Sequence, residues 1–299
     1  MICVVGPTAI GKTSLGIKIA KHFGAEILSA DSRQIYRHMA IGTAAPTPDE
    51  QKEATHHFVN FLEPSSTYSA GDFEKDSLAF LSTYFKSHSV AVLVGGSGLY
   101  AKGLIDGFDT LPSDTTIRTT LNERLLTSGL PALAHELLQL DPTHHAIIET
   151  HNPQRVIRAL EVCLVSGKPF SSFHTNSAST RPFDIIQIGL QAPRKTINQR
   201  IETRTHSMMD SGWLDETKSL LKFKQDDPLC NALKTVGYRE LISHLEGDMT
   251  LDEAVERIII STRQFAKRQM TWFKKDTRIV WFDHVDSVEA LEYCIQLNP

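Results

Sequence analysis

The chain has little cysteine, no long apolar run and no excess of positive charge. Its four cysteines (Cys3, Cys163, Cys230 and Cys294) are far apart and form no CxxC pair, which disfavours a zinc site and a disulfide framework. No stretch approaches the roughly 18–20 apolar residues that a membrane span needs. Lysine and arginine number 31 against 35 aspartates and glutamates, so the net charge is −4. A basic shell over the whole protein is therefore excluded, and any nucleic-acid surface must be local.

Other absences narrow the class further. There is no internal repeat and no low-complexity tract, and the opening residues MICVVGPTAIGKT lack the basic start of a signal peptide, so we expect a cytoplasmic protein. With 299 residues, 41 % of them apolar and 22 % charged, the composition is that of a globular protein. The length fits two domains, or one large α/β domain that carries an insertion.

Short apolar runs alternate with helical patterns over much of the chain. This alternation predicts an α/β fold, a parallel sheet flanked by helices. The predicted strands are residues 2–5, 25–30, 55–62, 90–94, 183–190 and 278–283, and the longer predicted helices are 69–87, 195–210, 213–224 and 251–273.

The segment 112–180 has a different character, because its β-branched runs stop. Helical patterns and breakers such as Gly129-Leu130-Pro131 replace them, and a stretch rich in Ser and Thr at 171–181 indicates a loop. We predict an all-helical insertion at 112–180 in a core made of residues 1–111 and 181–299. Its predicted helices are 117–128, 131–140 and 152–165.

A phosphate-binding loop follows the first predicted strand and opens a helical pattern. The segment GPTAIGKT matches GxxxxGK[ST], in which backbone N–H groups and a lysine hold an anion and the Ser/Thr hydroxyl can hold Mg²⁺. A nucleoside triphosphate and a diphosphate leaving group look alike to such a loop. The candidate diphosphate- or nucleotide-binding residues are Gly6, Pro7, Thr8, Ala9, Ile10, Gly11, Lys12, Thr13 and Ser14, with Thr13 as the magnesium ligand.

Two more polar segments follow predicted strands. DSRQIY begins at Asp31 and GGSGLY begins at Gly95. The carboxyl ends of parallel strands line the ligand crevice of open α/β sheets, so we expect Asp31 beside the phosphate loop. On position alone, Asp31 could equally cap a helix or close a turn.

The residues between 257 and 278 are strongly basic. Seven basic side chains face one acid, Asp276, which gives a local charge of +6, and Phe265, Trp272 and Phe273 lie among them. Basic charge with aromatic rings is typical of surfaces that bind loop RNA. The alternative is an amphipathic helix with its aromatics in the core and its lysines in water.

These segments, together with PQRVIRALEV, RIETR, TVGYRE and STRQFAKRQMTWF, resemble the bacterial tRNA dimethylallyltransferase family (tRNA isopentenyltransferases). The similarity runs from Cys3 to about Asp283. It implies a P-loop NTPase-like core that transfers a dimethylallyl group from dimethylallyl diphosphate to N6 of adenosine 37, in tRNAs that read codons beginning with U. It also implies Mg²⁺, a monomer, an adenine flipped into a channel, and an insertion that grips the anticodon stem-loop.

The resemblance also assigns roles to residues. It implies that Asp31 accepts the proton of the attacking amine and that Thr8, Lys12 and Arg204 neutralise the departing diphosphate, chemistry that suits a carboxylate and two cations. The residues that it places against tRNA are Asp31, Ser32, Arg33, Gln34, Ser97, Arg118, Gln154, Arg155, Val156, Ile157, Arg158, Lys234, Gly237, Tyr238, Arg239, Lys267 and Arg268.

Three other functions remain open at this stage. A small-molecule kinase would need productive ATP turnover. An isopentenyltransferase acting on free adenine nucleotides would not need the basic C-terminal segment or the helical insertion. An RNA-binding module without catalysis would have no use for Asp31 and Arg204 together.

Overall fold

The computed structural model describes residues 1–173, 180–226 and 230–297. Its internal contacts divide the chain into two compact units, Met1–Asp106 with Arg181–Pro299, and Gly107–Thr180. The predicted insertion falls within the second unit. Within the described residues, none of the helices combines the length and the apolar character that a bilayer crossing requires.

The first unit is built on a six-stranded sheet in which every pairing is parallel, in the order β3-β2-β4-β1-β5-β6. The prediction of a parallel sheet is therefore confirmed. The strands are β1 (Ile2–Val5), β2 (Ile27–Ser29), β3 (His56–His57), β4 (Val92–Gly95), β5 (Ile186–Gln191) and β6 (Val280–Asp283). Strand β3 is much shorter than predicted, because Phe58 and Asn60 adopt positive φ angles of 62° and 51° that end the extended run.

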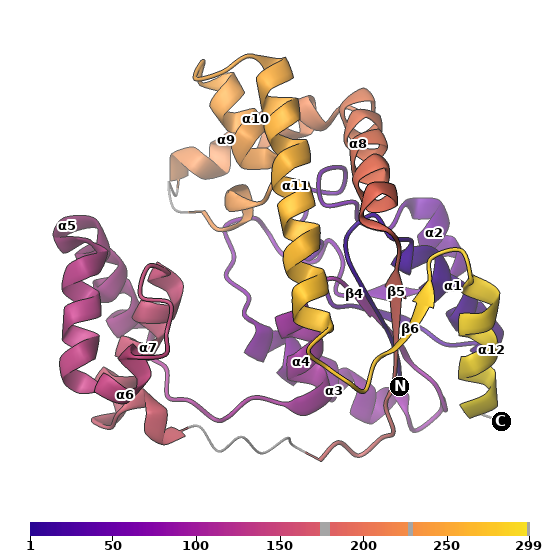
Figure 1. The fold of residues 1–299 in the computed structure, drawn as a ribbon, viewed down its shortest axis with the longest axis horizontal. Coiled ribbons are helices and arrows are strands. Elements are labelled where there is room, and N and C mark those ends of the chain that lie inside the picture. Colours follow the sequence, from indigo (N-terminus) through magenta and orange to yellow (C-terminus); the bar gives the residue numbers. More distant parts are fainter. Residues whose placement is uncertain (174–179, 227–229, 298–299) are drawn as a thin grey trace. The chain divides into compact units, whose positions relative to one another are not determined.

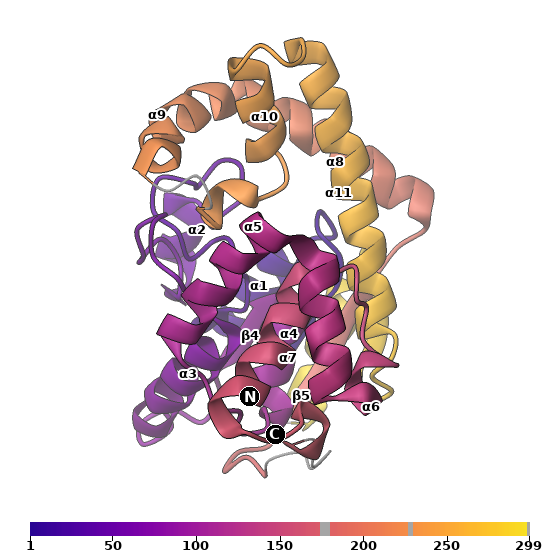
Figure 2. The ribbon, with the colours of Figure 1, turned by 90° about the vertical axis from the view of Figure 1, so that its left-hand side faces the viewer.

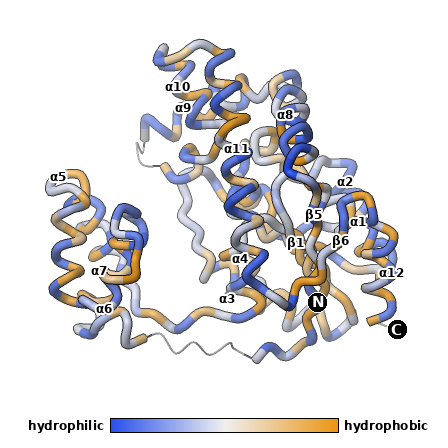
Figure 3. Tube along the Cα trace, viewed as in Figure 1, coloured by the Kyte–Doolittle hydropathy of each residue, from blue (hydrophilic) through white to orange (hydrophobic). Residues whose placement is uncertain are grey.

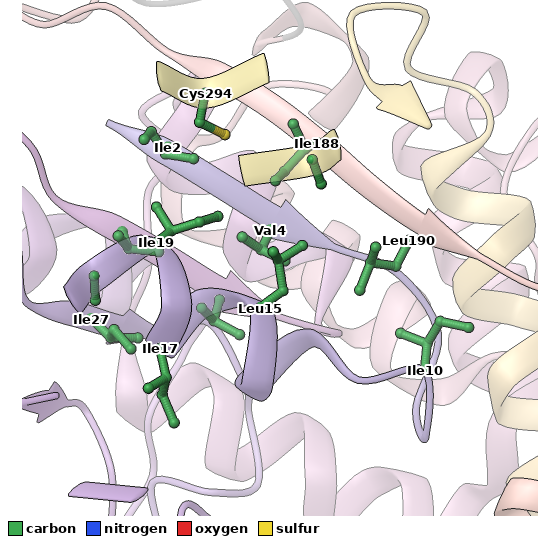
Figure 4. Packing of buried hydrophobic residues seen from close by; sticks show 14 of the residues in the cluster. Ile2, Val4, Ile10, Leu15, Ile17, Ile19, Ile27, Ile188, Leu190 and Cys294 are labelled. Carbon is green, nitrogen blue, oxygen red and sulfur yellow. The ribbon is translucent and has the colours of Figure 1, made fainter. Parts of the chain in front are cut away.

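Helices cover both faces of this sheet (Figure 1). On one side lie α1 (Lys12–Phe23), α2 (Pro48–Glu53) and α12 (Ser287–Leu297), and on the other α3 (Ala70–Tyr84) and α4 (Gly98–Asp106). The buried core lies between sheet and helices: Val4 of β1 and Leu190 of β5 pack with Leu15 of α1 (Figure 4). Figure 3 shows the apolar residues concentrated along the central strands.

Four further helices of the same unit pack with one another as a group (Figures 1 and 2). They are α8 (Arg194–Asp210), α9 (Trp213–Asp226), α10 (Tyr238–Leu245) and α11 (Leu251–Phe273), with a short turn of 3₁₀-helix η2 at Ala232–Lys234. The observed bounds of α11 match the prediction. Thr250 begins this helix with a capping box, accepting from the Glu253 N–H while Glu253 accepts in return.

The second unit is helical. It contains α5 (Thr115–Leu140), α6 (Pro142–His145), α7 (Pro153–Ser166) and η1 (Phe170–Phe173). Gly129, at φ 77°, interrupts α5 at the predicted break. Asn152 caps α7 by accepting from the backbone N–H groups of Gln154 and Arg155, as predicted. The predicted loop at 171–181 begins as η1, and its residues 174–179 lie outside the described residues.

Candidate active site around the phosphate loop

The phosphate loop connects β1 to α1 through strained backbone conformations. Gly6 and Gly11 have φ angles of 145° and 108°, and Ala9 lies in the left-handed region at 63°. A Cβ atom on Gly6 would come within 2.8 Å of the Leu190 carbonyl oxygen, so only glycine fits there. The first turn of α1 holds no acidic residue, which leaves the positive end of the helix dipole to an anion. Ile10 points into the core, so only its backbone can face a ligand.

Lys12 is the half-buried cation of this loop. Its Nζ donates to the Pro7 carbonyl oxygen at 2.8 Å. Burial lowers the pKa of Lys12 to about 8, and the Arg204 charge lowers it further while the Asp31 carboxylate opposes the shift. An anion bound beside Lys12 would stabilise its charged form, so the geometry favours a phosphate ligand.

Helix α8 brings two arginines to the loop. Arg204 Nη2 lies 2.5 Å from the Thr8 hydroxyl oxygen, and Arg200 Nε donates to the Ala9 carbonyl oxygen at 2.7 Å. Burial lowers the pKa of Arg204 to about 10, which still leaves it charged near neutrality. The motif predicted Arg204 but not Arg200. The signal for Arg200 was its spacing, because residues four apart share one face of a helix.

Three neighbouring strands end around this loop. In the order β2-β4-β1, Ala30 follows β2, Gly96 follows β4 and the phosphate loop follows β1. The carboxylate of Asp31, next along the chain, acts to raise the pKa of both Lys12 and Arg204. The expected convergence of the strand ends is therefore observed, and it sets a carboxylate near two half-buried cations.

The Asp31 side chain also shapes its own turn. Its Oδ1 accepts from the backbone N–H groups of Arg33 at 2.8 Å and Gln34 at 3.4 Å. Within the described residues no donor to Oδ2 is found, so that atom can take a proton or hydrogen bond from a substrate. The turn and the chemical role, which we had set as alternatives, use different oxygens.

Ser32, Ser97 and Gln34 line the same strand ends but face the protein. The Ser97 hydroxyl accepts from the Ser32 N–H at 3.0 Å. The Gln34 amide donates to the Ala44 carbonyl oxygen at 2.8 Å and accepts from Ser29 at 2.9 Å. Both ends of the Gln34 amide are engaged, so it holds the loop around Ala44. The expected contact of half-buried Gln34 with tRNA stays a prediction.

Tyr238 and Gly237 correct the prediction in a similar way. Tyr238 is fully buried; its hydroxyl donates to Glu216 at 2.6 Å and accepts from the Gly42 N–H at 3.1 Å. A Cβ atom on Gly237 would lie 2.0 Å from the Trp213 ring. Neither residue presents a side chain to a tRNA, because both serve the packing under the loop at Gly42. Glu216 and Trp213 lie in no motif, so their role is visible only in the structure.

Comparisons with known proteins agree on one family. Residues 34–276 match the model of the family described as IPP transferase. The chain belongs to this family. A tRNA dimethylallyltransferase of Christiangramia forsetii is 48 % identical over 95 % of this chain and 93 % of its own length, and one of Flavobacterium johnsoniae is 42 % identical over 99 % and 97 %.

Solved structures of the family are similar as well. The tRNA isopentenylpyrophosphate transferase of Bacillus halodurans is 32 % identical, with a TM-score of 0.72 over 99 % of this chain and 95 % of its own. A eukaryotic dimethylallyltransferase acting on tRNA has a TM-score of 0.80 over 95 % of this chain and 73 % of its own. At 24 % identity, the second likeness is one of fold alone.

Two predicted arginines of the insertion, Arg118 and Arg158, contact one buried acid. Glu161, 1 % exposed, accepts from Arg118 at 2.6 Å and from Arg158 at 3.0 Å. Val156 and Ile157 belong to the core of this unit, so their side chains cannot contact a tRNA, which corrects the prediction made for them. Because Val156 and Ile157 occupy the inward face of α7, the two residues before them lie on its outward face. The exposed members are Gln154 and Arg155, the latter paired with Glu149 at 3.1 Å.

The basic segment at 257–278 is partly neutralised. Arg263 pairs with Glu202 at 2.6 Å, and Arg278 pairs with Asp106 at 2.7 Å. Lys267 and Arg268 are exposed on α11 and have no ion-pair partner in the described part of the chain. Lys234 and Arg239 are exposed too, Arg239 beside Glu240.

The aromatic residues of α11 differ from one another. Trp272 is 40 % exposed and Phe265 37 %, whereas Phe273 is buried. The Arg268 guanidinium lies 5.9 Å from the centre of the Phe265 ring. Exposed rings beside unpaired cations fit the RNA-binding alternative better than a helix with all its aromatics in the core.

A protein-only metal site is not seen. No group of three or more His, Cys, Asp or Glu residues that could hold a metal ion occurs among the described residues. Mg²⁺ bound through substrate phosphates needs fewer protein ligands, since it keeps several waters. Thr13, at the start of α1 in the phosphate loop, offers the hydroxyl that such an ion uses.

Proposed function

We propose that the chain transfers the dimethylallyl group of dimethylallyl diphosphate to N6 of adenosine 37 in tRNAs that read codons beginning with U. One observation carries the proposal: the ends of β2, β4 and β1 bring Asp31 beside the phosphate loop that holds Lys12 and contacts Arg204. The names of the full-length relatives support tRNA as the acceptor.

Lys12 and Arg204 suit dimethylallyl diphosphate, the donor of the allyl group. When the amine attacks C1 of the allyl group, the C–O bond breaks and its electron pair leaves with diphosphate. Negative charge then grows on the leaving group, and Lys12, Arg204 and the loop N–H groups stabilise it. Both side chains are half-buried, so their charges are less screened by water than those of exposed side chains.

Asp31 suits the adenine amine that accepts the allyl group. The exocyclic amine of adenine is a weak nucleophile, and a carboxylate that accepts one of its N–H bonds raises its reactivity. As the new C–N bond forms, the amine proton passes to Asp31 Oδ2, and Oδ1 keeps the turn intact through its two backbone donors.

Mg²⁺ is part of this proposal. The Thr13 hydroxyl would hold it together with diphosphate oxygens and water, and the ion would supply further neutralisation of the leaving group. The acidic cluster that a protein-only site needs is not required for this arrangement.

The anticodon stem-loop is the proposed RNA partner. Lys267 and Arg268 offer unpaired charge to phosphates, and Phe265 and Trp272 offer exposed rings to unstacked bases. Flipping a base out of its stack costs the least free energy when the base lies in a loop and is not paired. We further propose that the chain acts as a monomer.

A transfer assay tests the function. Purified protein and Mg²⁺ are given radiolabelled dimethylallyl diphosphate with either an unmodified tRNA containing A36-A37-A38 or free AMP. We expect label on the tRNA alone, lost when A37 is replaced by G. Label on AMP would move the activity to free nucleotides. ATP hydrolysis without any label transfer would mean that the loop serves a kinase or another nucleotide hydrolase.

A further inference from the structure

A buried glutamine on α11 reaches the phosphate loop. The side chain of Gln269, 6 % exposed, accepts from the Thr8 N–H at 2.8 Å through Oε1 and donates to the Gly96 carbonyl oxygen at 2.9 Å through Nε2. These contacts join residues 261 and 173 positions apart in the chain. One side chain therefore links the ends of β1 and β4 to a helix from the C-terminal part of the protein.

The two partners allow only one kind of side chain. The Thr8 N–H needs an acceptor and the Gly96 carbonyl needs a donor, so the amide oxygen and nitrogen have one possible orientation. A carboxylate satisfies only the first partner, and an apolar side chain satisfies neither. Because both backbone groups lie beneath α11, an unmatched one would be costly.

Each partner belongs to one half of the site. Thr8 carries the hydroxyl that Arg204 contacts, so Gln269 fixes the backbone of the residue that faces the diphosphate. Gly96 precedes Ser97, whose hydroxyl accepts from the N–H of Ser32, the neighbour of Asp31. The Gln269 amide thus fixes the diphosphate-binding part of the site, at Thr8, relative to the part that carries Asp31.

The close approach of α11 is built into the glycines after β4. A Cβ atom on Gly96 would lie 2.4 Å from Gln269 Nε2, and one on Gly98 would lie 2.1 Å from Trp272 Cδ1. Gln269 and Trp272 are three residues apart and share one face of the helix. Lys267 and Arg268 precede them and are exposed, so the same helix presents charge to solvent and an amide to the phosphate loop.

We propose that Gln269 is a positioning residue that sets the phosphate loop and the turn after β4 for diphosphate binding and transfer. The inference deepens the proposed function and rests on it for the identity of the donor. Gln269 does not touch the reacting atoms in this account; it acts through Thr8 and Gly96.

Calorimetry with inorganic diphosphate and Mg²⁺ tests the inference directly, without tRNA. We expect Gln269→Met, which has nearly the same shape but no amide, to raise the Kd of diphosphate about tenfold. In the transfer assay the KM for dimethylallyl diphosphate should rise similarly, while the KM for tRNA stays within twofold. Gln264→Met is the matched control, an exposed glutamine five residues earlier on α11, and its diphosphate Kd should equal that of the wild type.

A second variant separates positioning from general loss of structure. Protonated glutamate has the same donor and acceptor as glutamine, so we expect the diphosphate Kd of Gln269→Glu to approach the wild-type value as pH falls from 8 to 5.5. This readout stands even if Gln269→Met does not fold.

Several outcomes would overturn the inference. The first is a diphosphate Kd of Gln269→Met within twofold of that of the wild type, and the second is an equal loss of tRNA and diphosphate affinity in that variant. The third is a ratio of the diphosphate Kd of Gln269→Glu to that of the wild type that does not change with pH. If the wild type binds diphosphate but labels no tRNA, the proposed function fails while the role of Gln269 in the loop is still measured.

Discussion

Arg204 and Thr8, 196 residues apart, are joined by a 2.5 Å hydrogen bond from guanidinium to hydroxyl. The bond ties α8 to the phosphate loop and keeps a half-buried positive charge beside it. Arg200 strengthens the link by donating to Ala9 one residue further along the loop.

Loss of Arg204 should therefore weaken the use of the prenyl donor. A hydrogen bond from a charged group contributes about 1.5–3 kcal/mol, so we expect Arg204→Ala to lower kcat/KM for dimethylallyl diphosphate by roughly 10- to 100-fold. Binding of tRNA, measured by filter retention without donor, should change little. Steady-state kinetics with each substrate varied in turn would show the split, and unchanged KM and kcat would contradict the role.

Asp31 can be tested with two substitutions that differ in one property. Asp31→Asn keeps an oxygen for the N–H groups of Arg33 and Gln34 but cannot accept a proton, whereas Asp31→Ala loses both functions. General-base help is worth about 10²–10⁴ in rate, so both variants should be nearly inactive while diphosphate binding persists. Only Asp31→Ala should show a lower melting temperature. Turnover close to normal in Asp31→Asn would remove the base role.

The depressed pKa of Lys12 predicts a pH dependence of diphosphate binding. The charged form attracts the anion, and the free protein loses this proton as pH rises through about 8. Above that pH the complex must take up a proton to regain the charge, so the diphosphate Kd should rise by up to about tenfold per pH unit. Since diphosphate itself titrates, the measurement is the ratio of Kd values for Lys12→Met and wild type from pH 6.5 to 9.5. A ratio that does not fall above pH 8 would contradict the prediction.

Replacement of Lys267 and Arg268 by alanine should weaken tRNA binding and its dependence on salt. Each phosphate contact adds about 0.7–0.9 to the slope of log K against log[salt], so the slope should fall by about 1–2. Lys21 and Lys52, which pair with Glu53 and Asp49, form a control pair whose replacement should leave the slope unchanged. An unaltered slope in the Lys267 and Arg268 variant would show that these side chains face solvent and do not contact tRNA phosphates.

Glu161 should be important for the stability of the helical insertion. Its buried carboxylate holds Arg118 and Arg158 together, and removing one partner of a buried ion pair costs about 3–5 kcal/mol. The arginines are partly exposed, so we expect Glu161→Ala to cost about 2–3 kcal/mol. Limited proteolysis of residues 107–180 and thermal melting would measure the loss; a melting temperature equal to that of wild type would show that the arginines find water instead.

Sequence patterns predicted the sheet, the insertion and the bounds of α11, because each depends on local periodicity and on breakers such as Gly129. They did not predict α4, which begins at Gly98. Small residues after a strand are typical of turns. In the structure Gly98 begins a helix, and the Trp272 ring lies so close to it that a side chain would not fit.

The site was predicted unevenly for a similar reason. Motifs predicted Lys12, Asp31 and Arg204, the charged residues around the phosphate loop. Glu216 could not be found from spacing, because its partners are backbone groups or a side chain distant in sequence. Glu161 and Gln269 lie inside the quoted segments PQRVIRALEV and STRQFAKRQMTWF, but no pattern indicated which partners their side chains would take. Conversely, Val156 and Tyr238 lie inside motifs but are buried, since a motif conveys position along the chain and not the direction of a side chain.

Arg181, where the chain returns from the insertion, donates to the carbonyl oxygens of Leu104 at 2.9 Å and Gly103 at 2.6 Å, just before the chain departs. The Arg181 side chain thus bridges the two places where the inserted segment leaves and re-enters the core. A few residues of turn could join Asp106 to Arg181, and the entropy of closing so short a gap is small. The remaining chain would keep all six strands, so the sheet does not depend on the inserted residues, and we expect that a different helical segment could replace them without loss of the core fold.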